Sequence, residues 1–248
     1  GIITPDALAR VLKDDTALVC VMTVNNITGA IQPIDALCAL THERGALFFT
    51  DAVQAVNSLD LNVKKSGVDM LAASAHKFYG QKGAGFLYVR SGVRLKPVLA
   101  GGEQERGLRG GTQNVTGIVA MGAAIQKAAD MRAEYAAHAK AVSAEFLKTL
   151  RYGRAVETTQ KTDDITSVIF DGVNGGRLAV ALSCAGVCCS VGSACSAGSA
   201  TPPTALVNMG VENADCAVRF SFGRGVSLTA ARRAARIVNA VVKQLSGL

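Results

Sequence analysis

The sequence contains no tryptophan, and only 5% of its 248 residues are aromatic. Proteins that bind single-stranded nucleic acid usually stack the bases on aromatic rings, so this composition argues against that class of ligand. The net charge of +7 would suit an anionic partner, but the basic residues are scattered, apart from Arg232, Arg233 and Arg236. We therefore expect no direct binding of nucleic acid.

The sequence also lacks long apolar runs. No run approaches the length of a membrane span, and the sequence does not open with a basic segment followed by an apolar one. With 49% apolar and 18% charged residues, the composition is that of a globular protein of one large or two small domains. These features predict a cytoplasmic protein with no membrane association.

The cysteines do not suggest a disulfide framework, because their number, seven, is odd. Cys184, Cys188 and Cys189 lie close together, but none of the three histidines lies near them. We therefore predict no metal site and expect most of the cysteines to be small buried residues.

Cys195 is the exception. It lies in the segment 191–203, which is built almost entirely from glycine, serine, alanine, threonine and proline and has little to pack with. An exposed thiol is an oxidative liability unless its chemistry is used, so a nucleophilic role and an incidental free thiol are equally compatible with this position. We expect a mobile, exposed loop here.

The stretch 68–89 carries the strongest chemical signal. It reads as a short apolar strand that ends in Ser74, His76 and Lys77, followed by a glycine-rich turn and a second strand over 86–89. A lysine at the end of a buried strand is well placed to form a Schiff base, because burial favours its neutral, nucleophilic form. The alternative is a solvated lysine at a strand end, which is where most lysines lie.

Two earlier apolar runs also end in polar residues. The run 17–24 leads into Asn26 and the run 46–50 into Asp51, so that Asn26, Asp51 and Lys77 are separated by 25 and 26 residues. This spacing suits successive strand–crossover–strand units, whose strand ends share one edge of a parallel sheet. The three side chains would then face one site. Pyridoxal phosphate (PLP) needs such groups, a lysine for its aldehyde and an acid for its ring nitrogen.

The remaining elements follow from periodicity and stop signals. The segment 98–113 holds five glycines and two arginines and suits either an anion-binding loop or a mobile surface loop. The segment 115–150 is expected to form one long helix or two joined helices that lead to a second domain. Other helices are predicted over 6–13, 34–44, 177–184 and 229–245, and other strands over 166–170, 187–190 and 217–222.

Taken together, Asn26, Asp51, Lys77, Cys195 and Arg219 resemble the site of a cysteine desulfurase. The similarity is to the nitrogen-fixation and iron–sulfur-cluster branch of the class V aminotransferase group, which has PLP fold type I. It covers almost the whole sequence, and its most specific segments are residues 74–80, 105–112, 192–196 and 219–224.

The resemblance implies an α/β fold and a homodimer. Residues 1–115 would form an incomplete large domain with the mostly parallel sheet of PLP fold type I. Residues 116–150 would connect it to a smaller α+β C-terminal domain, 151–248, that carries the cysteine loop.

The resemblance also implies roles around the cofactor PLP. Lys77 would hold PLP covalently and later move protons, while Asp51 would pair with the ring nitrogen. Gln54 would hydrogen-bond the ring hydroxyl oxygen, and Ser74 and His76 would bind the phosphate. Thr112 from the other subunit would join them at the phosphate.

The substrate implied is L-cysteine. Arg219, with Asn26, would bind its carboxylate, because a guanidinium fork matches that group. Cys195 would attack the substrate sulfur, keep it as a persulfide and release L-alanine. The persulfide would pass to a sulfur-acceptor protein, either a cluster scaffold or a sulfur carrier for tRNA thiolation.

The sequence departs from the family pattern at its start. Members of the family carry a sizeable N-terminal portion, with a phosphate-binding threonine and a histidine that stacks on the PLP ring. Neither has a counterpart here, since His42 falls on a predicted helix away from the site. We expect a fragment, an expressed piece, or one half of a split protein that needs a separate N-terminal polypeptide, and we expect PLP to be weakly held.

Two other functions remain open. One is a related class V aminotransferase or selenocysteine lyase, which would form product without needing Cys195. The other is a catalytically impaired chain that binds a partner, or that carries sulfur on Cys195 without producing it.

Overall fold

The computed structural model describes residues 1–192 and 201–247. Its internal contacts divide the chain into two compact units. We call residues 3–23 and 33–132 the N-terminal unit, and residues 1–2, 24–32 and 133 onward the C-terminal unit. The short segment 24–32, which holds Asn26, thus belongs to the C-terminal unit although it follows the first strand of the other.

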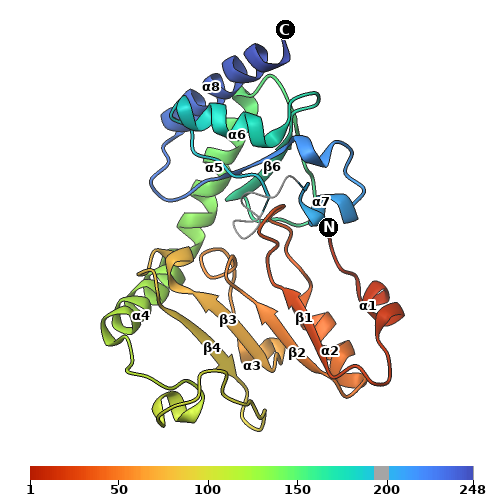
Figure 1. The fold of residues 1–248 in the computed structure, drawn as a ribbon, viewed down its shortest axis with the longest axis vertical. Coiled ribbons are helices and arrows are strands. Elements are labelled where there is room, and N and C mark those ends of the chain that lie inside the picture. The colour runs from red at the N-terminus through yellow and green to blue at the C-terminus, as the bar shows by residue number, and fades with distance from the viewer. Residues whose placement is uncertain (193–200, 248) are drawn as a thin grey trace. The chain divides into compact units, whose positions relative to one another are not determined.

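A four-stranded sheet forms the centre of the N-terminal unit (Figure 1). The first three strands pair in parallel in chain order and the fourth pairs antiparallel to the third. Their bounds are β1 Leu18–Met22, β2 Leu47–Asp51, β3 Met70–Ser74 and β4 Gly85–Val89. The predicted α/β fold with a mostly parallel sheet is therefore confirmed.

Among the described residues, four α-helices belong to this unit, of which α2 and α3 connect successive strands. They are α1 Pro5–Val11, α2 Ile34–Glu43, α3 Val63–Ser66 and α4 Val115–Asp130. α1 begins where Thr4 accepts a hydrogen bond from the Ala7 N–H at 3.1 Å, with proline in its first turn. After α2 the chain turns at Gly45, whose φ of 72° is costly for other residues.

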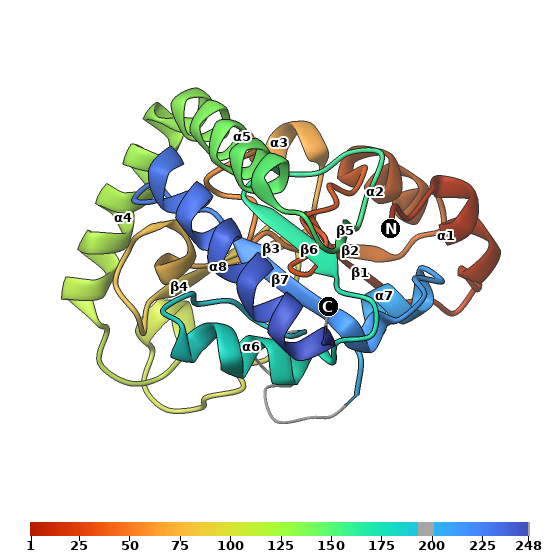
Figure 2. The ribbon, with the colours of Figure 1, turned by 90° about the horizontal axis from the view of Figure 1, so that it is seen from above.

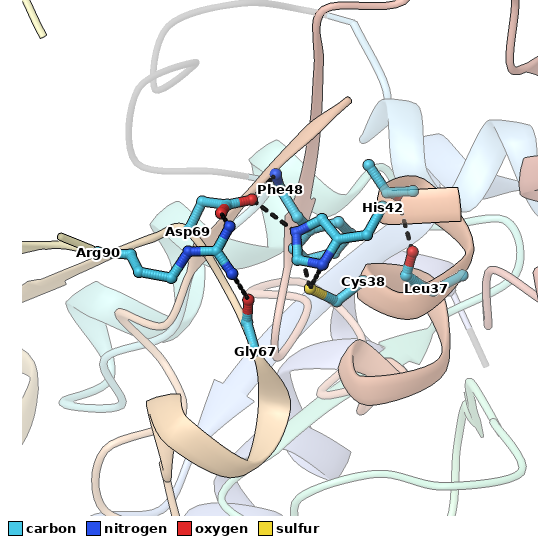
Figure 3. Close-up of polar contacts among 8 residues, drawn as sticks. Leu37, Cys38, His42, Phe48, Gly67, Asp69 and Arg90 are labelled. Carbon is cyan, nitrogen blue, oxygen red and sulfur yellow. Dashed lines mark hydrogen bonds and ion pairs between the residues drawn. The ribbon is translucent and has the colours of Figure 1, made fainter. Parts of the chain in front are cut away.

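A buried polar cluster holds the amino-terminal end of β3, at the opposite end of that strand from Ser74 (Figure 3). The Asp69 carboxylate is fully buried and accepts hydrogen bonds from the Phe48 N–H at 2.7 Å and from His42 Nε2 at 2.8 Å. Arg90, which follows β4, completes the cluster by an ion pair with Asp69. His42 therefore ties α2 to the sheet, away from the carboxyl ends of the strands.

The C-terminal unit is built on a three-stranded antiparallel sheet, β5 Arg154–Ala155, β6 Ile165–Ile169 and β7 Ala217–Ser221. Its helices are α5 Arg132–Thr149, α6 Gly175–Cys184, α7 Thr204–Asn208 and α8 Leu228–Ser246 (Figure 2). Phe146 of α5 packs on Phe220 of β7 with ring centroids 4.7 Å apart, and both are buried in the core of this unit.

The helical stretch 115–150 forms two joined helices, α4 and α5, with the break at Met131, which is one of the two forms predicted. Two other expectations about elements need correction. The segment 187–190 is not a strand, because the Val187 N–H turns back to the Leu182 carbonyl and only Ser190 pairs with β7. β3 ends at Ser74, so that His76 and Lys77 lie on a 3₁₀ turn, η1 Ala75–Phe78.

Within the residues described, no helix is both long enough and apolar enough to cross a membrane. The cytoplasmic location expected from the sequence stays a prediction.

Candidate active site

Two parallel strands of the N-terminal unit end at the same edge with polar residues. Asp51 is the last residue of β2 and is aligned with Ala72 of β3, and Ser74 ends β3 two residues later. The Val53 N–H donates to Oδ1 of Asp51 at 2.8 Å, which orients the carboxylate just beyond the strand. This edge is the usual ligand-binding edge of an open parallel sheet.

The turn η1 places His76 and Lys77 directly after β3. Ala75 and Phe78 are fully buried and pack with residues of α4, and Asn57 Nδ2 donates to the Lys77 carbonyl at 2.8 Å. The buried side chains of the turn and the hydrogen bond from Asn57 therefore fix the backbone at Lys77. Nothing in the sequence predicted that Asn57 would hold the Lys77 carbonyl.

The side chains of His76 and Lys77 face outward from η1. Ser74 Oγ and His76 Nδ1 lie 2.9 Å apart and form a hydroxyl–imidazole pair. Both His76 and Lys77 are exposed. Of the two alternatives that the sequence left open for Lys77, a buried amine and a solvated one, the structure shows the solvated one, because the buried side chains of the turn are its neighbours Ala75 and Phe78.

Gln54 and Thr112 lie in the same unit. Gln54 is half-buried in the turns that follow β2. Thr112 is exposed in the glycine-rich loop, where its carbonyl accepts from Arg109 Nη1 at 3.3 Å. Their assigned roles at the PLP hydroxyl and phosphate stay predictions.

In the C-terminal unit, Arg219 and Asn26 lie together. Arg219 is on β7, and its Nη1 donates to the carbonyls of Asn26 at 2.9 Å and of Gly192 at 3.2 Å. Burial lowers the pKa of Arg219. The Asn26 segment is anchored by Ser167 Oγ, which donates to the Ile27 carbonyl at 2.6 Å.

Cys195 lies outside the described residues. The other cysteines correct one expectation, because only Cys38 and Cys216 are buried, whereas Cys20, Cys184 and Cys188 are exposed. Cys184 and Cys188 are exposed because they flank the turn at Gly186, after the last buried residue of α6, Leu182.

The groups at the sheet edge of the N-terminal unit fit PLP by their chemistry. Asp51 offers a carboxylate for the ring nitrogen, and the Ser74–His76 pair offers donors for a phosphate. Lys77 offers an amine for the aldehyde, on a turn that immediately follows β3.

The aminotransferase class-V family model matches residues 1–229. The chain therefore belongs to this family of proteins.

Within the family, the chain is similar to cysteine desulfurases. It is 41% identical over 254 aligned positions to a putative cysteine desulfurase, IscS 1, of Bacillus subtilis, covering 99% of this chain and 67% of that protein. It is 42% identical over 226 positions to a cysteine desulfurase of Gluconacetobacter diazotrophicus, covering 88% of this chain and 56% of that protein. The resemblance stated from the sequence is confirmed.

A solved structure shows the same fold. A NifS-like protein superposes with a TM-score of 0.88 at 30% identity, covering 100% of this chain and 66% of that one. The chain thus spans between about half and two thirds of the length of the relatives it matches.

Proposed function

We propose that this chain carries most of the machinery of a PLP-dependent cysteine desulfurase, which converts L-cysteine to L-alanine and keeps the sulfur as a persulfide on Cys195. The observation that supports this best is the gathering of Asp51, Ser74, His76 and Lys77 at one edge of a parallel sheet. Similarity to cysteine desulfurases over nearly the whole chain supports the same reaction.

PLP, when bound, would supply an electron-withdrawing ring that stabilises negative charge on the substrate carbon. Lys77 would hold it and move protons to and from that carbon. Asp51 would keep the ring nitrogen protonated, and Gln54 would donate to the ring hydroxyl oxygen. Ser74 and His76 would hold the phosphate, with Thr112 of a second copy.

Arg219 would bind the substrate carboxylate, with Asn26 beside it. Its Nη1 already donates to two carbonyls, so the guanidinium is fixed while its other N–H groups can still donate. The Cys195 thiolate would attack the substrate sulfur as the carbon–sulfur bond breaks. The electron pair of that bond stays with the β-carbon of the substrate, which takes up a proton. The product is released as alanine, and the sulfur stays on Cys195.

We further propose that a second polypeptide completes this site. Leu18 and Leu47 pair in register on the same sheet face as Asp51 and are 45% and 36% exposed. Parallel sheets are normally covered on both faces, so this face favours a covering partner. A second copy in a homodimer, or a separate N-terminal polypeptide, would supply it, and a sulfur-acceptor protein would bind transiently.

One observation favours a second candidate, a catalytically impaired chain that carries sulfur. Lys77 is exposed in this chain, whereas a Schiff-base lysine works best when partly desolvated. Such a chain would accept sulfur on Cys195 from another protein without forming alanine.

The experiment measures alanine and sulfide released from L-cysteine by the purified chain with PLP and a thiol reductant, which reduces the persulfide and frees its outer sulfur as sulfide. The proposal expects both products from the wild type, no sulfide after Cys195→Ala, and unchanged release after Cys184→Ala, which removes an exposed thiol outside the proposed site. Alanine that forms without Cys195 would instead indicate a different class V enzyme. No alanine, together with persulfide accepted from another protein, would indicate the carrier.

A further inference from the structure

A groove lies on the surface of the C-terminal unit beside α8. α6 and α8 pack next to each other, and residues 185–188 leave the end of α6 (Figure 2). The open groove between these residues, α8 and β7 has a volume of about 410 Å³. This volume lies in the range of pockets that take apolar groups.

The groove has an apolar floor and a polar rim. Val187, Phe220 and Phe222 lie at the floor and are buried. The rim is formed by exposed residues, among them Cys188, Ser221, Ala230 and Arg233.

The helices α6 and α8 beside the groove carry charge of one sign. α6, α8 and the residues 185–192 contain five basic residues and no acidic one, namely Arg177, Arg232, Arg233, Arg236 and Lys243. Arg232 is neutralised by Glu145 of α5, whose Oε1 lies 2.7 Å from the arginine Nε. Within the described residues, Arg233 and Arg236 have no ion-pair partner, and they lie one helical turn apart on α8.

The combination of an apolar floor and two arginines without an ion-pair partner favours one kind of ligand. The phosphates of a nucleic acid could contact the arginines, but its bases could not stack on the aromatic rings of the floor, because these rings are buried. An acidic amphipathic helix uses both features, since its apolar side chains recur at i, i+3, i+4 and i+7 on one face. Its carboxylates would then face the arginines, which gives charge complementarity.

We propose that this groove binds an acidic amphipathic helical segment of a partner protein. The apolar anchors of the partner would lie over Val187 and Phe220, and its carboxylates would face Arg233 and Arg236. The inference concerns binding and does not depend on the proposed desulfurase activity.

The test uses the full chain and a labelled synthetic helix of about 16 residues, roughly four turns, with leucine on one face and glutamate elsewhere. Fluorescence anisotropy is expected to show binding that weakens with added salt. Arg233→Glu is expected to weaken binding about tenfold. Lys140→Glu on α5, which makes the same charge change at another exposed position, is expected to change it less than about twofold.

A second measurement locates the bound helix. Alkylation of Cys188, followed by peptide mass spectrometry, is expected to slow when the acidic helix is bound, whereas alkylation of the exposed Cys20 on β1 is expected to stay unchanged. The proposal is overturned if the acidic helix does not bind, or if the same peptide with lysine in place of glutamate, or a DNA duplex, binds more tightly. Equal losses in the two variants, or binding without protection of Cys188, would also overturn it.

Discussion

At the scale of single residues, Asp69 is the position where charge and burial oppose each other most directly. Burial alone would raise its pKa, but the hydrogen bonds from His42 and the Phe48 N–H, with the charge of Arg90, hold the pKa of Asp69 below its ordinary value of 3.8. The folded chain therefore favours the ionised form, and this stabilisation is complete above the ordinary pKa and lost as the pH falls through the lowered one.

We predict that Asp69→Asn lowers the free energy of unfolding by about 3 kcal/mol at neutral pH, because a buried ion pair loses one partner. The difference from wild type should shrink as the pH falls below the ordinary carboxyl pKa and through the lowered pKa of Asp69, where the wild-type carboxyl becomes protonated. Urea unfolding at several pH values checks both. Asp60→Asn, which removes an exposed ion pair to Arg132, should cost less than about 1 kcal/mol, and a difference that grows in acid would contradict the account of Asp69.

Cys38 lies in the same cluster and should be unreactive. Burial, and then the charge of Asp69, raise the pKa of its thiol to about 11. Because the thiolate is the reactive form, Cys38 should be alkylated at pH 8 at least about tenfold more slowly than the exposed Cys184 at the end of α6. Peptide mass spectrometry after timed alkylation measures both rates, and equal rates would show that Cys38 is accessible.

At the scale of elements, the turn η1 depends on the glycine that follows it. A Cβ at Gly80 would lie 2.9 Å from Ala75 Cβ and 3.0 Å from the Ala75 carbonyl oxygen, closer than real contacts allow. Both Ala75 and its carbonyl belong to the turn that carries Lys77. Gly80 is therefore required for the shape of that turn.

We predict that Gly80→Ala destabilises the chain by about 2 kcal/mol, the cost of forcing an atom into packed space. Gly122→Ala is the matched control, because Gly122 lies inside α4 with no atom within 4 Å of a new Cβ. It should raise stability by about 0.5 kcal/mol, since alanine favours helix more than glycine does. Urea unfolding measures both, and a neutral Gly80→Ala would contradict the close approach.

The helices and strands were largely predictable because local sequence signals mark where each one begins and ends. The apolar runs before Asp51 and Ser74 became β2 and β3, and the predicted helix before Gly45 ends within two residues of that glycine. The failed strand at 187–190 shows the limit of this reasoning. Its apolar residues suit a strand, but the Val187 N–H is used to close α6 and is lost to pairing, which local periodicity does not reveal.

At the scale of the whole molecule, the sequence predicted the order of the strands better than the unit to which each candidate residue belongs. Asp51 ends β2 and Lys77 follows the adjacent strand β3, and this strand order follows from the short crossovers. Asn26 instead belongs to the C-terminal unit, because Ser167, far along the chain, bonds to the carbonyl of the next residue, Ile27. The sequence also left open whether Lys77 is buried or solvated, since that depends on what covers the turn.

The central claim is that Lys77 is the amine that holds PLP. The most direct measurement is to incubate the purified chain with PLP, reduce the product with borohydride, and locate the modified lysine by peptide mass spectrometry. We predict modification at Lys77 that is lost in Lys77→Ala and retained in Lys82→Ala, which removes another exposed lysine five positions along the chain. Modification spread over surface lysines, or a PLP adduct that survives Lys77→Ala, would contradict the claim.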